Sequence, residues 1–268
     1  MKRLISLSAA LLLTLSACAG PGGAAASPSP SLIPSPTPQI TAQWGETTYT
    51  DDTVDEASGT TLMTVAFSLP HIISPEMTAA WEAINDYYQA ELEPLQSSAE
   101  DTAAAAKEDF SYSGQFDASF HTYAMEESYA LKLNTPQYAS LLRTYYIYTG
   151  GAHGEVYLTG DTFDMTTGTR LELDDLFTVS REAYMSRLME EVKRQIAERA
   201  ESESWPEWSE GGVWTEDDVT GAFDPAWFYL TPDGLTLYYQ VYSLGPHALG
   251  SPEFPIAKEV LEDILISW

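Results

Sequence analysis

The order of amphipathic and β-rich segments limits the fold more than any other feature of this sequence. The first amphipathic stretch follows Ser74, a favourable helix N-cap, and Pro75, which suits the first helical position. Its apolar residues recur every three or four positions, at Met77, Trp81, Ile84, Tyr88 and Leu92. A second stretch begins after Ser180 and extends to about Glu203, with apolar residues at Tyr184, Leu188, Val192 and Ile196. Because this spacing gathers apolar side chains on one face, both stretches are predicted to be helices packed on apolar surfaces.

Short β-rich segments surround these two predicted helices. Pro94 is expected to end or kink the first helix, and the alanine-rich residues up to Glu108 to resume it. The predicted strands lie at 43–50, 61–69, 110–123, 138–148, 155–165, 169–177 and, as a pair about a Pro-Asp-Gly turn, within 228–242. A short helix is expected at 257–265. Since hairpins join most of the strands, the sequence predicts an α+β fold in which an antiparallel sheet is covered by two long helices.

The N-terminus has the pattern of a lipoprotein signal. Residues 1–17 contain two basic residues, an apolar segment and then small residues, as secretory signals do. The four residues that end at Cys18 resemble the lipobox of bacterial lipoproteins, which implies cleavage before Cys18 and lipidation of its thiol. The apolar segment is too short to span a bilayer of ~30 Å, and the proline- and serine-rich residues 18–40 are typical of a linker. We therefore expect a protein anchored by lipid to the extracytoplasmic face of the bacterial cell membrane.

The remainder of the chain is strongly acidic. The sequence holds 40 Asp and Glu against 12 Lys and Arg, a formal net charge of −28. Such a surface repels nucleic acid and anionic lipid, and it attracts cationic proteins, cationic peptides or divalent metal ions. The alternative is that the acidity only keeps an exported domain in solution. Cys18 is the only cysteine, so the folded part has no disulfide bond and depends on its hydrophobic core for stability.

A glycine-rich corner raises the question of catalysis. His153 lies among Gly150, Gly151 and Gly154, directly after the strand predicted at 138–148. In one interpretation His153 is a metal ligand or general base, with His247 from a second glycine-flanked corner and with Asp161 or Asp164 as an acidic partner. In the other, the glycines supply positive φ angles or close backbone approach, and His153 only holds the turn. The sequence favours the second interpretation.

The wider sequence contains none of the common catalytic motifs. His-Glu-x-x-His, Gly-x-Ser-x-Gly and phosphate-binding glycine loops are all missing from it. No catalytic residue, metal site or cofactor is therefore assigned. A segment at 201–214 is more typical of a binding surface, since it mixes indole rings with carboxylates that suit lysine and arginine side chains. Its candidate partner-binding residues are Trp205, Glu207, Trp208, Glu210 and Trp214, and the corner residues His153 and His247 are also candidates for contact with a partner. The indoles would alternatively cover the end of the second helix.

Residues 149–154, 163–177, 228–242 and 245–250 together resemble, in order and spacing, an extracytoplasmic module of bacterial proteins. The module and its N-terminal companion are shared by lysozyme-sensing anti-sigma factors (RsiV-like) and the N-terminal region of a peptidoglycan deacetylase (PdaC-like), and most proteins with the pair are uncharacterised. The resemblance implies two intimately packed α+β modules, at 41–144 and, of the RsiV-like type, at 145–268. It does not carry anti-sigma or deacetylase activity to this chain.

The chain departs from that family at two places in the corners. Family members often have Asn where Glu155 stands, and Tyr-Ala-Ala where His247, Ala248 and Leu249 stand. The leading hypothesis is a lipid-anchored, non-enzymatic envelope protein whose acidic head binds a cationic protein such as lysozyme, or a cell-wall component. The alternatives are a peptidoglycan-active enzyme or metal-dependent accessory that uses His153 and His247, and a scaffold that binds nothing specific.

Overall fold

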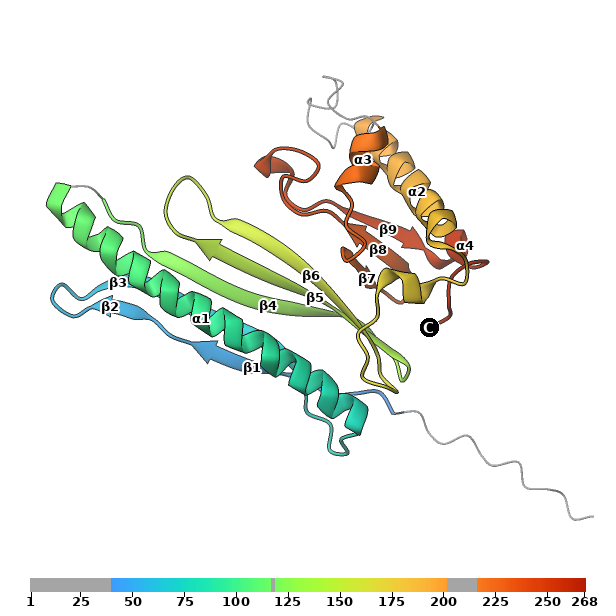
Figure 1. Ribbon diagram of the computed structural model, residues 1–268, viewed down its shortest axis with the longest axis horizontal. Helices are drawn as coiled ribbons and strands as arrows, with labels where there is room; N and C mark the ends of the chain where they lie inside the picture. Colours follow the sequence, from blue (N-terminus) through green and yellow to red (C-terminus); the bar gives the residue numbers. More distant parts are fainter. Residues whose placement is uncertain (1–39, 117–118, 202–215) are drawn as a thin grey trace, which may run out of the picture. The chain divides into compact units, whose positions relative to one another are not determined.

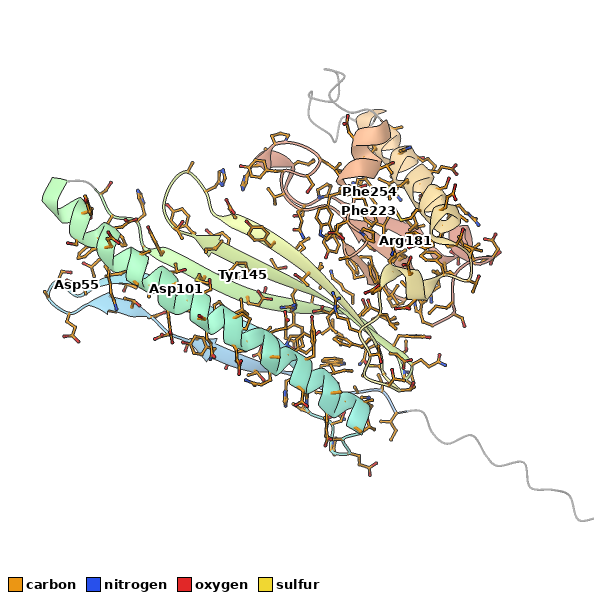
Figure 2. All side chains as sticks on the ribbon, in the orientation of Figure 1. Asp55, Asp101, Tyr145, Arg181, Phe223 and Phe254 are labelled. Atoms are coloured by element: carbon orange, nitrogen blue, oxygen red, sulfur yellow. The ribbon has the colours of Figure 1, made fainter. Side chains whose placement is uncertain are left out.

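The computed structural model describes residues 40–116, 119–201 and 216–268, and it forms two sheets with separate hydrophobic clusters (Figure 1). Residues 39–268 make up one compact unit that contains both clusters. The first cluster gathers side chains from residues 42–165, and the second includes Phe223 and Phe254, which are labelled in Figure 2. The α+β class is confirmed. Each long helix covers a sheet of its own, whereas the sequence predicted a single sheet.

The first sheet has the strand order β1 (Trp44–Thr50), β3 (Thr60–Ile72), β4 (Tyr123–Asn134), β5 (Tyr138–Tyr148) and β6 (Glu155–Asp164). The short strand β2 (Thr53–Asp55) also pairs with β3, and it lies between the strands predicted at 43–50 and 61–69, where no strand was expected. Neighbouring strands are antiparallel except β3 and β4, which are parallel. Parallel neighbours need a crossover connection, and helix α1 (Ala79–Phe116) supplies it.

Helix α1 is continuous through Pro94, so the expected break is wrong. Pro94 lies on the exposed face, while the buried face continues the apolar spacing through Ala99, Ala106 and Phe110. For the same reason the strand predicted at 110–123 is wrong: residues 110–116 are the end of the helix, and β4 begins only at Tyr123.

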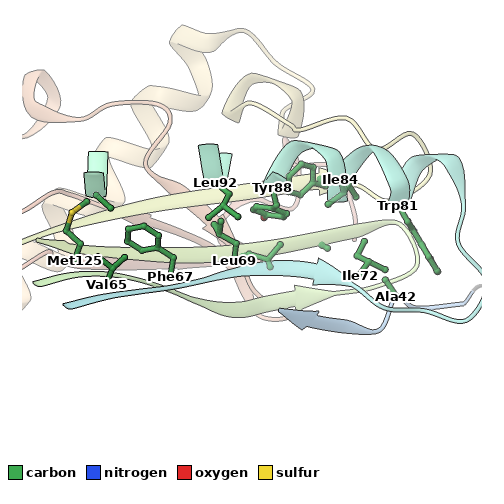
Figure 3. Packing of buried hydrophobic residues seen from close by; sticks show 14 of the residues in the cluster. Ala42, Val65, Phe67, Leu69, Ile72, Trp81, Ile84, Tyr88, Leu92 and Met125 are labelled. Carbon is green, nitrogen blue, oxygen red and sulfur yellow. The ribbon is translucent and has the colours of Figure 1, made fainter. Parts of the chain in front are cut away.

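The start of α1 also differs from the sequence prediction. Thr78 Oγ1 accepts a hydrogen bond from the Trp81 backbone N–H at 3.1 Å, so Thr78 caps the helix. Ser74 Oγ instead accepts a hydrogen bond from the Gln43 N–H at 2.8 Å. Figure 3 shows Trp81, Ile84, Tyr88 and Leu92 above β3, where they pack on Phe67, Leu69 and Ile72 in the first cluster.

The second sheet is formed by β7 (Phe228–Leu230), β8 (Gly234–Tyr238) and β9 (Glu253–Ala257), all antiparallel. The predicted hairpin at 228–242 is confirmed, but β9 was not expected. Helix α2 (Arg181–Glu201) packs here as predicted: Tyr184, Leu188 and Val192 are buried. The second cluster also draws on the short helices η1 (Leu173–Leu176), α3 (Glu216–Ala222) and α4 (Lys258–Leu261).

Two of the smaller sequence predictions hold only in part. The turn at 166–168 exists, with Gly168 at φ 77°, but the predicted strand at 169–177 is limited to one bridge between Phe163 and Arg170 before η1 begins. The predicted C-terminal helix is shorter than 257–265, because β9 occupies its first residue and α4 ends at Leu261.

The two sheets meet where β5 and β6 lie against β7 and β8. Gly160 N–H donates to the Tyr238 hydroxyl at 2.8 Å, and Leu230 N–H donates to Ser140 Oγ at 2.8 Å. A Cβ at Gly160 would lie only 1.8 Å from the Phe228 carbonyl oxygen, so this close approach requires glycine. The expected module boundary between residues 144 and 145 falls inside β5, a central strand of the first sheet.

Buried charges lie next to this junction. Arg143 on β5 donates to Asp161 at 2.8 Å, to Glu127 at 3.1 Å and to Glu91 at 2.9 Å. Asp161, which is completely buried, also accepts from Arg170 at 2.9 Å and from the Tyr87 and Tyr88 hydroxyls. Burial would lower the pKa of Arg143, but Asp161 and Glu127 outweigh it and raise that pKa. We call Arg143, Asp161, Glu127, Glu91 and Arg170 the buried charge network.

Glu127 makes part of this network sensitive to pH. Burial raises the pKa of Glu127 above its ordinary value of 4.5, although Arg143 opposes the shift. The folded state therefore holds this proton more tightly than the unfolded state does. The contribution of Glu127 to the free energy of unfolding should fall as pH rises from 4.5 through the higher folded-state pKa.

Glu127→Gln should remove that pH dependence. The free energy of unfolding of the variant, relative to that of the wild type, should therefore increase as pH rises through this window. Loss of the ion pair with Arg143 changes stability as well, but the comparison concerns only the slope with pH. Urea denaturation at several pH values measures the difference. Glu126→Gln, on the exposed face of the same strand, is the matched control and should leave the pH profile unchanged. Parallel profiles for the Glu127→Gln variant and the wild type would contradict the assignment.

Candidate functional site

Two loops meet at the end of the β5–β6 hairpin: the hairpin loop, residues 149–154, and the β8–β9 loop, residues 239–252. Gly150 and Gly151 have φ angles of 93° and 94°, which side chains rarely adopt. A Cβ at Gly154 would lie 2.3 Å from the Tyr146 ring. The conformational interpretation of these three glycines is confirmed: two supply positive φ angles and the third allows close approach.

The structure brings the two corner histidines into direct contact. The His153 and His247 rings are stacked, with centroids 3.7 Å apart and planes inclined by 20°. His153 Nδ1 lies 3.1 Å from the Gly154 carbonyl oxygen, and the Tyr242 hydroxyl lies 3.2 Å from His153 Nε2. Because a carbonyl only accepts, Nδ1 carries the proton of the neutral His153 ring, and in that tautomer Nε2 accepts from Tyr242. We call His153, His247 and Tyr242 the histidine cluster.

Tyr242 is held in an unusual conformation within this cluster. Its φ is 69°, the only positive φ of a non-glycine residue in the described ranges, and its side chain is 56% exposed. Such a backbone is disfavoured for an aromatic residue, and strained residues of this kind concentrate at functional sites. Tyr242 was not among the residues predicted from the sequence, because no local pattern marks a tyrosine for the left-handed region.

The geometry of the histidine cluster does not suit a shared metal ion. The lone pairs of imidazole nitrogens lie in the ring plane, so two nearly parallel stacked rings direct them side by side and not toward one point. Both nitrogens of His153 also have protein partners already. Among the residues that the structure describes, no group of three or more His, Cys, Asp or Glu is arranged to hold a metal ion.

Neither acidic residue suggested as a partner of His153 reaches it. Strand β6 rises by ~3.3 Å per residue from Glu155, so Asp161 and Asp164 lie roughly 20–30 Å along the strand. Asp161 belongs to the buried charge network, and Asp164 Oδ1 accepts from the Thr166 and Thr167 N–H groups. This pairing is therefore wrong, because both carboxylates are near the other end of the strand.

A small cavity of about 210 Å³ adjoins the histidine cluster. It is lined by Glu155, Val156, Tyr157, Val241, Tyr242 and His247. The Tyr157 hydroxyl donates to Glu155, and this hydrogen bond is the main cause that raises the pKa of Tyr157. Exposed aromatic rings thus lie beside Glu155, which is one of the positions where the chain departs from the RsiV-like pattern. Such a surface can accept a cationic or polar group.

The other candidate residues lie outside the described ranges. Trp205, Glu207, Trp208, Glu210 and Trp214 belong to residues 202–215, and Cys18 belongs to residues 1–39. In the part of the chain that the structure describes, no helix has the length and apolar character needed to cross a bilayer.

Comparison with known proteins identifies both halves of the fold. Residues 174–259 match the family model described as a protein of unknown function (DUF3298), and residues 56–155 match the model described as deacetylase PdaC. The two matches confirm the expected pairing of the C-terminal module with the companion that precedes it. No curated protein is significantly similar to the chain.

Two solved structures share the fold. A DUF3298 family member from Bacteroides fragilis superposes with a TM-score of 0.65 at 19% identity, covering 84% of this chain and 94% of that one. A DUF3298 family protein from Pseudomonas aeruginosa gives a TM-score of 0.54 at 17% identity, covering 85% of this chain and 96% of that one. At these identities the likeness concerns the fold alone. The chain therefore combines a region that matches PdaC with one that matches DUF3298, as is typical of extracytoplasmic proteins of unknown function.

Proposed function

We propose that the protein is a lipid-anchored, non-enzymatic envelope protein whose acidic head binds a cationic protein, such as lysozyme, or a cell-wall component. The observation that carries the proposal is the histidine cluster. Loops from the two sheets converge there into an exposed surface of aromatic rings beside Glu155. Loops held by a rigid scaffold are where binding residues concentrate.

The composition of this surface suits a basic partner. Tyr242 and Tyr157 are 56% and 46% exposed, and exposed tyrosines next to a carboxylate provide cation–π and ion-pair contacts. The overall charge of −28 adds long-range attraction, which raises the rate of encounter with a cationic protein. The short-range contacts would decide which cationic protein is held.

The alternative of a peptidoglycan-active enzyme has less support in the geometry. His153 is a weak candidate for a general base, because its Nε2 is occupied by Tyr242 and neither suggested carboxylate supports it. Stacking of the two imidazoles also disfavours a metal ion bound by both. No observation in the described residues favours this reaction over binding.

Calorimetric titration with lysozyme tests the proposal. Residues 39–268 should bind lysozyme with one-to-one saturation both at low salt and at about 0.15 M salt, where the screening length is ~8 Å. Cytochrome c, which is similarly basic, serves as the control protein. Heat that disappears with salt, or that is the same with cytochrome c, would mean that charge alone attracts lysozyme and that the proposal for lysozyme is wrong.

Substitution of the histidine cluster should weaken the same complex. His247→Ala and His153→Ala each remove one member of the stacked pair, and a central interface residue of this kind typically contributes ~1.4 kcal/mol or more, a tenfold change in Kd. His71→Ala, on β3 away from both loops, is the matched control and should leave Kd unchanged. Lysozyme binding that survives both loop substitutions would place the interface elsewhere.

A further inference from the structure

A second cavity adjoins the hairpin loop. It has a volume of about 390 Å³, near the lower end of the ~300–1,000 Å³ typical of ligand pockets. Its walls come from the C-terminal part of α1, the residues before β4 and the hairpin loop, and we call it the α1 recess. Its lining residues are Asp109, Tyr112, Ser113, Ser119, Phe120, His121, Tyr123, Thr149, Gly150 and Gly151.

Aromatic side chains form one wall of the α1 recess. The Phe120 ring is stacked on Tyr123, with centroids 5.9 Å apart and planes inclined by 18°. Phe110 packs edge-on against Phe120, with ring centroids 5.3 Å apart, and this contact supports the stacked pair. Tyr112, which also lines the recess, is 56% exposed. The wall therefore combines ordered aromatic rings with one ring that is open to solvent.

A carboxylate lies against this aromatic wall. The Tyr123 hydroxyl donates a hydrogen bond to Asp109 Oδ2. Burial, and then the hydrogen bond to Asp109, raise the pKa of Tyr123 to about 12, so the hydroxyl remains a donor at neutral pH. Asp109 forms no ion pair with any Lys or Arg in the described part of the chain, and no Lys or Arg lines the recess.

The hairpin loop lines the α1 recess with two glycines, Gly150 and Gly151. A Cβ at Gly151 would have no atom within 4 Å, so the space beside this backbone is open. An incoming group can therefore approach the backbone closely at the glycines. Ring faces, a carboxylate held by a tyrosine hydroxyl, and open space beside the backbone are the parts of a site for an organic cation.

We propose that the α1 recess binds the side chain of a lysine or arginine residue, with its cationic group against Asp109 and the rings of Tyr112 and Tyr123. The strong excess of acidic residues over the whole chain favours the entry of a cation. This proposal rests on the proposed function in one respect: the lysine or arginine would belong to the cationic protein that binds the head. A small cationic ligand tests the recess separately.

Chemical-shift titration of residues 39–268 with N-acetyl-arginine amide is the first experiment. At neutral pH and about 0.15 M salt, the backbone amides of Gly150 and Gly151 should shift and saturate. N-acetyl-citrulline amide has the same shape without the charge, and it should produce no saturable shift. N-acetyl-lysine amide should bind at the same amides. If none of the cationic probes shifts these amides, or if citrulline shifts them equally, the proposal is wrong.

Substitution of Asp109 is the second experiment. Asp109→Asn keeps an oxygen that accepts from Tyr123, so the fold is retained while the charge is lost. Binding of N-acetyl-arginine amide should weaken about tenfold, as for loss of a hydrogen-bonded charge. Asp101→Asn removes the same charge from an exposed position on α1 (Figure 2) and should have no effect. Equal loss in both variants would mean that only the general acidity attracts the cation, which would overturn the proposal.

Tyr112→Leu separates the role of the ring from that of the charge. It removes an exposed aromatic face and leaves Asp109 in place, so the probe should bind severalfold more weakly. Lysozyme then tests whether the recess also binds a cationic side chain that belongs to a protein. If lysozyme binds Asp109→Asn normally while the small probe does not, the recess takes small cations but lies outside the lysozyme interface. If the small probe binds and lysozyme never does, the proposal for the recess is supported and the proposal of lysozyme as the partner is wrong.

Discussion

Arg143→Met is expected to lower the free energy of unfolding by about 3–5 kcal/mol, as measured by urea denaturation of residues 39–268. The side chain of Arg143 is almost fully buried and pairs with Asp161, Glu127 and Glu91. Methionine has a similar shape but no charge, so Glu127 would remain in the interior without its cation. Removal of one partner from a buried network is destabilising because the remaining charge has lost its hydration.

Arg181→Met is the matched control for this prediction. Arg181, which is labelled in Figure 2, pairs with Asp174 at the surface, where both side chains are well exposed. Water solvates both groups when the pair is broken, so the substitution should change stability little. If the Arg143 and Arg181 variants lost equal stability, the buried charge network would not contribute as the geometry suggests.

Gly160→Ala is expected to destabilise the fold by about 3 kcal/mol or more. The added methyl group would lie 1.8 Å from the Phe228 carbonyl oxygen and 2.9 Å from its carbonyl carbon. These are backbone atoms, so the contact cannot be relieved by rotation of a side chain, and β6 and β7 would have to separate. Separation would also disturb the hydrogen bond between Gly160 N–H and Tyr238. Overpacked interiors typically lose ~1–3 kcal/mol, and rigid backbone neighbours place this position at the upper end.

Gly221→Ala provides the comparison within the same chain. Gly221 lies in α3, where an added Cβ would meet no atom within 4 Å beyond its own helix, and its φ is not in the left-handed region. Alanine should therefore be neutral or stabilising by ~0.5–1 kcal/mol. Thermal or urea unfolding of both variants measures the difference. A Gly160→Ala variant as stable as the wild type would mean that the two sheets are not in the close contact described.

Local patterns in the sequence predicted the elements whose apolar spacing is uninterrupted. Strand β5 and the buried stripe of α2 lie where the sequence placed them, and so does the turn between β7 and β8. The prediction failed at the end of α1, where aromatic residues that alternate plausibly as a strand continue a helical face. Helix and strand periods are hard to distinguish in short aromatic segments, and packing on the first sheet decides between them.

The candidate sites, too, could be predicted only in part from the sequence. The glycines around His153 could be predicted from sequence, because few residues tolerate positive φ angles. The contact between His153 and His247 was only one possibility, since 94 residues separate them and just the pairing of the sheets brings the loops together. Asp161 and Asp164 were wrong as partners of His153, although they are close to it in sequence. They lie on an extended strand, in which each residue adds ~3.3 Å to the distance from His153.

The sequence by itself determined the class of the fold, the positions of its second long helix and several strands, and the conformations that glycine alone permits. Each of these depends on local periodicity or on the backbone freedom of single residues. The tertiary structure alone decided that two sheets form and that Arg143 has its partners in the interior. It also decided that the histidine cluster and the α1 recess adjoin the same hairpin loop. These features depend on contacts between residues far apart in the chain, whose geometry is fixed only when the two sheets pack together.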